Sequence, residues 1–348
     1  MTLTTFMQDL PFVALIVIIV IFLFLLSKGA DILVEEAVAL SIRWGIPSVV
    51  IGATIVSLGT TLPEMAVSVM GAVRGNPGLA LGNAVGSIIA DTGLILGLAA
   101  LIKPLPLRKE VVNRQGWIQV GSGFLLVLAC FPWSNPGAAF SEGGTLPQWL
   151  GWVFLGLLVL YIYKSIIWSK SSGEAGEAET EALQHSKKEE NTTSIVLFLK
   201  LCLGIGLVLI SSQILIPAVE ETAVRLSVPD AIIAATLVAL GTSLPELVTA
   251  ITAVRRNHGE LAVGNVIGAD ILNVLFVAGA AASVTPGGLV ASGYFFNFLF
   301  PAMILLLVVF RVGIFVSKTH LTRPFGALMI AIYLGVTVVS YMVGVDMH

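Results

Sequence analysis

Charged residues are scarce in this chain of 348 residues. They make up 11% of it, against roughly a quarter in an ordinary soluble domain. Hydrophobic residues make up 57%, and the mean hydropathy is +0.98. A soluble core cannot bury that much apolar surface, so a lipid bilayer must cover it. The net charge of −3, with no basic patch interleaved with aromatic residues, also excludes nucleic acid as a partner.

Cysteine and histidine are scarce as well, with two and four residues. Cys130 and Cys202 lie in apolar runs and do not form a disulfide framework. The sequence has no nucleophile–base set, phosphate-binding loop or metal-hydrolase spacing, so we expect neither an enzyme nor a bound cofactor. Residues 1–10 have no basic n-region, and we expect the apolar run that follows to be a first span, not a cleaved signal.

Long apolar runs dominate the remainder of the chain. A membrane-spanning helix needs about 20 mostly apolar residues, and ten segments meet that requirement. The sequence therefore predicts an all-α membrane protein with ten transmembrane helices. The first is long enough to be tilted, or broken at Gly29-Ala30-Asp31. The expected spans are residues 11–41, 47–73, 79–102, 115–131, 148–168, 194–224, 229–254, 261–284, 290–316 and 324–344.

A polar stretch at residues 169–193 separates two sets of five spans and has the composition of a solvated linker. Lysine and arginine set the sidedness, because cytoplasmic loops collect them. Only Arg74 and Arg225 fall on the side opposite the linker, which is therefore expected in the cytoplasm, with both termini outside. The linker's side collects Arg43, Lys103, Arg108, Lys109, Arg114, Lys164, Lys170, Lys187, Lys188, Arg255, Arg256, Arg311, Lys318 and Arg323. We expect a multi-pass protein of the cell membrane, the inner membrane where a cell has two.

The two halves contain an internal repeat. Residues 51–104 align without a gap to residues 233–286 at an offset of 182, with 21 identities in 54 positions. Five spans separate equivalent points, so the copies cross the membrane in opposite directions. The chain thus divides into residues 1–168, the linker, and residues 194–348. Inverted repeats are typical of secondary transporters, whose substrate sites lie where the halves meet, although channels also contain inverted duplications.

Each repeat places a glutamate in the middle of an apolar span. Glu64 shares a helix face with Ser57, Thr60 and Thr61, and Glu246 has Thr242 and Ser243 at the equivalent positions. A carboxylate at the bilayer centre costs roughly 3 kcal/mol or more, so it indicates a functional site. One such residue could be a structural hydrogen-bonding group, but two symmetric ones favour function.

A proline precedes each glutamate and frees a backbone carbonyl one turn earlier. Pro63 cannot donate to the carbonyl of Gly59, and Pro245 cannot donate to that of Gly241. Carboxylates, hydroxyls and carbonyls together form an all-oxygen set, which suits Ca²⁺ and Na⁺. No histidine or cysteine joins the set, so zinc or copper is not expected.

The next span of each repeat adds a second polar stripe. Asn83, Ser87 and Asp91 are spaced by four residues and share one helix face; the equivalents are Asn265, Ala269 and Asn273. Asp91 is a third buried carboxylate. Asp270 is a fourth acid, but it replaces Ile88 of the first repeat and is rotated off the stripe.

The blocks Gly59-Thr-Thr-Leu-Pro-Glu64 with Gly82-Asn-Ala-Val-Gly-Ser87, and Gly241-Thr-Ser-Leu-Pro-Glu246 with Gly264-Asn-Val-Ile-Gly-Ala269, resemble the two α-repeats of the calcium/cation antiporter superfamily. They are most similar to those of prokaryotic sodium/calcium exchangers. The resemblance implies that Glu64 and Glu246 bind both Ca²⁺ and Na⁺. It also implies cation ligands at Thr60, Thr242, Thr61, Ser243, Ser87, Asp91 and Asn273, and backbone carbonyl ligands at Ser57 and Ala239.

Two departures from that family's pattern stand out. The family has an amide in the first repeat and an aspartate in the second, whereas Asp91 and Asn273 reverse the order. Ala269 lacks a hydroxyl that the family uses at one sodium site, so that sodium position has one ligand fewer here.

The expected mechanism is alternating access, in which Ca²⁺ and several Na⁺ compete for the same carboxylates. Two alternatives stay open. Paired buried acids can hold a proton, because burial and like charges favour the neutral form, so proton/calcium exchange is the first alternative. A cation channel or a membrane scaffold is the second.

Overall fold

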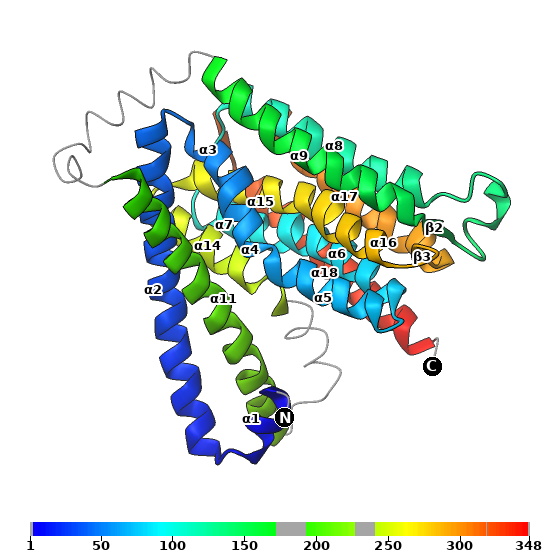
Figure 1. Ribbon diagram of the computed structural model, residues 1–348, viewed down its shortest axis with the longest axis horizontal. Helices are drawn as coiled ribbons and strands as arrows, with labels where there is room; N and C mark the ends of the chain where they lie inside the picture. The colour runs from blue at the N-terminus through cyan, green and yellow to red at the C-terminus, as the bar shows by residue number, and fades with distance from the viewer. Residues whose placement is uncertain (1–2, 172–192, 227–240, 318, 347–348) are drawn as a thin grey trace.

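The computed structural model describes residues 3–171, 193–226, 241–317 and 319–346. These residues are mostly helical (Figure 1). The first half contains α1 (Leu3–Asp9), α2 (Phe12–Trp44), α3 (Ser48–Ile51), the π-helix η1 (Gly52–Val56), α4 (Ser57–Thr60), α5 (Leu62–Val73), α6 (Pro77–Ala90), the π-helix η2 (Asp91–Ile95), α7 (Leu96–Ile102), α8 (Lys109–Cys130), the short 3₁₀ turn η3 (Pro136–Ala138) and α9 (Gln148–Ser171).

From Leu244 to Val284 the second half repeats the order of elements found from Leu62 to Ile102. It contains α11 (Ser194–Arg225), α14 (Leu244–Arg255), α15 (Gly259–Leu272), the π-helix η5 (Asn273–Ala278), α16 (Gly279–Val284), the π-helix η6 (Phe295–Leu299), α17 (Phe300–Val316) and α18 (Arg323–Asp346). Two short antiparallel strand pairs join loops of this mostly helical chain. Strand β1 (Leu105–Pro106) pairs with β4 (His320–Leu321), and β2 (Gly144–Leu146) pairs with β3 (Leu289–Ala291).

Seven of the described helices are long and apolar enough to cross a membrane, or eight if the bent pair of residues 48–60 and 62–73 is one span. They coincide with eight of the ten expected spans, and the protein is a multi-pass membrane protein. Helix α8 lies at the expected fourth span, but it carries polar residues such as Gln115 and Gln119 and is not among the apolar eight. Much of the expected span at residues 229–254 lies outside the described residues, which include only α14 of it.

The long helices α2 and α11 lie side by side and lean away from the other helices (Figure 1). Helix α2 is continuous, so the break considered at Gly29-Ala30-Asp31 does not occur. Gly29 instead permits close packing, because a Cβ atom there would lie 2.8 Å from the Cβ of Leu207 and 3.0 Å from the backbone of Val208. Gly204 of α11 meets the backbone of Leu33 in the same way.

The 182-residue offset of the sequence repeat recurs in the helix boundaries. Helices α5 and α14 begin and end at equivalent positions, and so do α6 and α15. Both α6 and α15 then pass into a π-helix at equivalent residues, Asp91 and Asn273. The two repeats therefore have the same local structure, not merely similar sequences.

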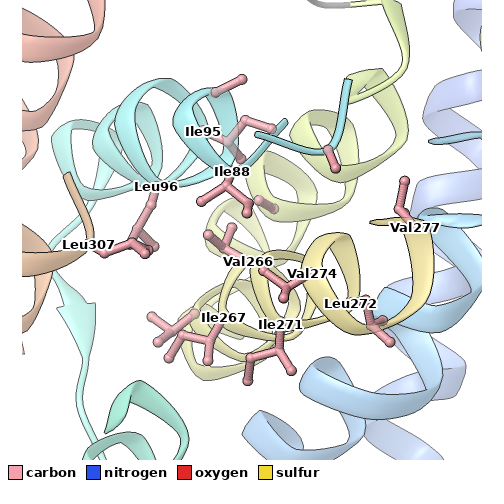
Figure 2. Close-up of a cluster of buried hydrophobic side chains, with 14 of the residues drawn as sticks. Ile88, Ile95, Leu96, Val266, Ile267, Ile271, Leu272, Val274, Val277 and Leu307 are labelled. Atoms are coloured by element: carbon pink, nitrogen blue, oxygen red, sulfur yellow. The ribbon is translucent and has the colours of Figure 1, made fainter. Parts of the chain in front are cut away.

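Helix α15 forms the centre of the molecule and is buried from Leu261 to Leu272. It packs against α3, η1 and α4 through glycines, since a Cβ at Gly264 would lie 2.1 Å from the carbonyl oxygen of Val49. Apolar side chains of α6, η2, α15 and η5 form the core around it (Figure 2). This close packing brings the polar residues of both repeats into one region.

Candidate cation-binding site

The first helix of the first repeat breaks three residues before its glutamate, and α14 of the second repeat begins in the same way. Thr61 (φ −82°, ψ 0°) ends α4, and α5 starts at Leu62 after a bend of 44°. Ser243 has nearly the same conformation (φ −87°, ψ 10°) before α14. Pro63 causes the break, because a proline cannot donate the backbone hydrogen bond that would continue the helix, and Pro245 lies at the same position at the start of α14. Glu64 and Glu246 consequently lie in the first turns of α5 and α14.

The three carboxylates predicted from the repeats are buried close together. Glu64, Glu246 and Asp91 are each about 1% exposed. They lie near enough for Glu64 to interact electrostatically with both of the others. The hydroxyl of Thr61 donates a hydrogen bond to Oε1 of Glu246 over 3.2 Å, which joins the first repeat to the second.

Asn83 joins the two repeats at a second point. Its amide group donates to the backbone carbonyl of Glu64 at 3.3 Å and to the hydroxyl of Ser68 at 3.0 Å. Its Oδ1 accepts a hydrogen bond from the hydroxyl of Thr242 at 3.4 Å. Asn83 thus links the start of α5 in the first repeat to Thr242, which lies just before α14 in the second repeat.

Asp91 and Asn273 are direct neighbours. The amide of Asn273 donates to Oδ2 of Asp91 over 3.4 Å, and both residues are about 1% exposed. Each is the first residue of a π-helix. A π-turn inserts an extra residue into the helix, and such turns occur frequently at functional sites.

The other predicted ligands lie in the same region. Ser57, Thr60, Ser87 and Ser243 are buried, and Thr242 is half-buried. The carbonyl of Ser57 is not free in this structure, since it accepts the backbone N–H of Thr61 at 2.9 Å and the hydroxyl of Thr60 at 3.3 Å. Ala239 lies outside the described residues.

Several of the buried oxygen atoms accept no hydrogen bond within the described part of the chain. They are both carboxylate oxygens of Glu64, Oε2 of Glu246, Oδ1 of Asp91 and Oδ1 of Asn273. Among the described residues no lysine, arginine or histidine forms an ion pair with these three acids. Buried carboxylates are normally paired or bind a cation. An all-oxygen set of this kind is the type that hard cations prefer.

The sequence alone does not indicate the contacts that two residues, Asn83 and Asp270, make in this region. The sequence places Asn83 on the polar stripe but not in the site, because its contacts with Ser68 and Thr242 depend on how the helices pack. The sequence also shows Asp270 as an acid off the stripe, but it does not indicate the partners Thr92 and Gln119. The unusual replacement of Ile88 by an acid in the second repeat was the available signal.

Comparison with known proteins gives a family match along both halves. The model of the sodium/calcium exchanger protein family matches residues 14–167 and 196–342. The inner membrane protein YrbG of Escherichia coli is 33% identical over 78% of this chain and 80% of its own length. The sodium/calcium exchanger MaX1 of Methanosarcina acetivorans is 28% identical over 94% of this chain and 98% of its own length.

Solved structures agree on the fold. The sodium-calcium exchanger NCX_Mj, in a crystal soaked with 10 mM Na⁺ and zero Ca²⁺, superimposes with a TM-score of 0.74. The match covers 93% of this chain and 98% of the other at 24% identity. With a family match over both halves, the chain belongs to the sodium/calcium exchanger protein family.

Proposed function

We propose that this protein exchanges Ca²⁺ for Na⁺ across the membrane by alternating access. One observation supports this most directly: Glu64, Glu246 and Asp91 come from two repeats, are buried together, and present oxygens that no described donor contacts. The relatives described as sodium/calcium exchangers support the choice of ions. The transported ions are the substrates, and no further cofactor is proposed.

The proposed ligand set combines carboxylates with neutral oxygens. Glu64, Glu246 and Asp91 would supply the charge, with three Na⁺ neutralising the three carboxylates and one Ca²⁺ nearly doing so. The empty site would carry uncompensated charge through apolar surroundings, which is costly, and this cost couples the two ions. The neutral ligands proposed are Thr60, Thr61, Thr242, Ser243, Ser87 and Asn273, with the backbone carbonyls of Ser57 and Ala239.

We also propose ten spans arranged as two inverted five-helix repeats. The recurrence of helix boundaries at an offset of 182 residues supports this arrangement. Two contacts near the helix ends agree with the proposed sidedness. Arg256 pairs with Asp31 of the first long helix, as expected for two cytoplasmic positions. Arg225 donates to the carbonyls of Leu10 and Gln8, as expected if the N-terminus is outside.

Transport of radiolabelled Ca²⁺ into proteoliposomes tests the proposal. Vesicles loaded with Na⁺ should take up Ca²⁺, vesicles loaded with K⁺ should not, and Glu64→Gln and Glu246→Gln should each abolish uptake. Glu35→Gln is a matched control, because Glu35 is an exposed acid outside the buried set, and it should retain Na⁺-driven uptake. Ca²⁺ flux that requires no counter-ion would instead indicate a channel.

Proton/calcium exchange is the second candidate, and one sequence feature favours it. Ala269 replaces the hydroxyl expected at one sodium position, which leaves fewer oxygens for Na⁺. Under this alternative, a pH gradient should drive Ca²⁺ uptake in vesicles free of Na⁺. The absence of uptake under a pH gradient, together with uptake under a Na⁺ gradient, would eliminate it.

A further inference from the structure

A second buried acidic group lies beside the proposed exchange site. Asp270 of α15 is 1% exposed. Its Oδ2 accepts the hydroxyl of Thr92 and the amide of Gln119, each at 2.5 Å. The three residues come from α15, η2 and α8, and only Asp270 is ionisable. The group is therefore one carboxylate held by two neutral donors from other helices.

The fold does not require a polar group at this position. The residues equivalent to Asp270 and Thr92 in the opposite repeats are Ile88 and Val274, at the same 182-residue offset. Ile88 and Val274 are buried members of the apolar core in Figure 2. Because the equivalent pair is apolar, the hydrogen bonds of Asp270 are not a packing requirement of the repeat.

Within the described part of the chain, the carboxylate of Asp270 has no ion-pair partner and is incompletely hydrogen-bonded. Oδ1 of Asp270 and Oε1 of Gln119 accept no hydrogen bond from any residue that the structure describes. The charged group that faces Asp270 from η2 is Asp91, which interacts with it electrostatically and also interacts with Glu246 of α14. Both are acidic, α3, η1 and α4 contain no charged residue, and Arg114 of α8 forms no ion pair with Asp270 among the described residues. A buried carboxylate in acidic surroundings requires a compensating positive charge.

We propose that Asp270, with Thr92 and Gln119, forms a separate site that binds one monovalent cation, Na⁺ or H⁺. One carboxylate with neutral oxygen neighbours matches a single positive charge. A divalent ion would need more charge and six or more oxygen ligands. Asp270 is not one of the ligands that occupy equivalent positions in the two repeats, and it is adjacent in sequence to Ala269. It would give the exchanger one monovalent ion beyond those held by Glu64, Glu246 and Asp91, so its role in transport rests on the proposed function.

Asp270→Asn isolates the charge, because an amide oxygen can still accept the hydrogen bonds from Thr92 and Gln119. A second variant, Asp270→Ile with Thr92→Val, recreates the apolar pair of the opposite repeat and is expected to fold as that pair does. Both variants lose the carboxylate, but only the second loses the polar contacts. If both variants change cation binding to the same extent, the change is due to the lost charge of Asp270 and not to the lost hydrogen bonds.

The experiment measures the unfolding free energy of the full-length purified protein against log Na⁺ concentration and against pH. The slope counts the ions bound by the folded protein in excess of the unfolded one. For a Na⁺ site, both variants should lower the Na⁺ slope by one ion; for a proton site, they should lower the pH slope by one proton. Unchanged slopes in both variants would overturn the proposal and leave Asp270 a structural residue.

A transport assay separates this inference from the proposed function. Asp270→Asn should still take up Ca²⁺, but with one fewer Na⁺ or H⁺ moved per Ca²⁺, measured from the gradient that stops net flux. If the wild-type protein showed no Na⁺-driven uptake, the proposed function would fail, while the binding slopes would still decide whether Asp270 holds a cation.

Discussion

Asn273 donates a hydrogen bond to Asp91 over 3.4 Å, although the two residues occupy the same position of different repeats. Equivalent residues of a duplicated structure meet only beside the axis that relates the copies. Asp91 therefore lies at the junction of the two halves. If the negative charge were moved from position 91 to position 273, it would shift only by the distance between two hydrogen-bonded side chains.

We expect Asp91→Asn to reduce Ca²⁺ transport at least about tenfold, which corresponds to about 1.4 kcal/mol of lost interaction. Adding Asn273→Asp should restore much of the activity, because the double variant returns the carboxylate to the junction. Initial rates of Na⁺-driven Ca²⁺ uptake provide the measurement. A well-folded double variant as inactive as Asp91→Asn would contradict this symmetry argument.

The hydroxyl of Thr61 stabilises the carboxylate of Glu246 from the opposite repeat. Thr61→Val removes this donor and leaves another buried oxygen without a partner. Hydrogen bonds to charged groups contribute about 1.5–3 kcal/mol, so the half-saturating Ca²⁺ concentration should rise about tenfold or more. Thr61→Ser is the matched control and should remain near wild type. Equal effects of valine and serine would mean that the methyl group matters, not the hydroxyl.

The repeat made much of this structure predictable. A proline before each glutamate predicted a missing backbone hydrogen bond one turn earlier, and in the structure the first repeat's helix breaks at Thr61 while Ser243 has nearly the same conformation before α14. The alignment also predicted which acids would lie together, because equivalent residues must face the same junction. These predictions depend on local backbone chemistry and on symmetry, both of which can be read along one chain.

Contacts that break the symmetry were not predictable in the same way. Gln119 lies on α8, outside the duplicated segment, and only the packing of α8 against α15 brings it to Asp270. The sequence allows a helix break at Gly29, but in the structure this glycine permits close packing of α2 against α11. A glycine permits either outcome, and the neighbouring helix decides between them.

Arg256 at the end of α14 pairs with Asp31 at 2.8 Å and with Glu35, both on α2. The groups are partly exposed, so the pairs should contribute under about 1 kcal/mol and weaken as salt screens them. We expect Arg256→Gln to lower the melting temperature slightly at low salt and hardly at all at high salt. Arg255→Gln, at the adjacent position, should show a smaller salt-dependent difference. A large loss at high salt would indicate that Arg256 stabilises the fold by packing instead.

Gly268 allows α15 to lie directly against the segment that leads to the predicted ligands. A Cβ atom there would approach Cα of Ala53, the carbonyl oxygen of Ala53 and Oγ of Ser57, each to 2.5 Å. Two of these atoms belong to the backbone and cannot move without shifting η1, so Gly268→Ala should destabilise the protein by about 1–3 kcal/mol.

Thermal unfolding in detergent would measure this loss, with Gly156→Ala of α9 as the control. A Cβ atom at Gly156 meets nothing within 4 Å, and alanine favours a helix over glycine by about 1 kcal/mol. The control should therefore be unchanged or slightly more stable. Equal unfolding temperatures for the two variants would contradict the close contact between α15 and η1.

Because Ser57 lies at that contact, Gly268→Ala should also slow Ca²⁺ uptake. A destabilised variant with full transport would show that the position of Ser57 is not critical for transport.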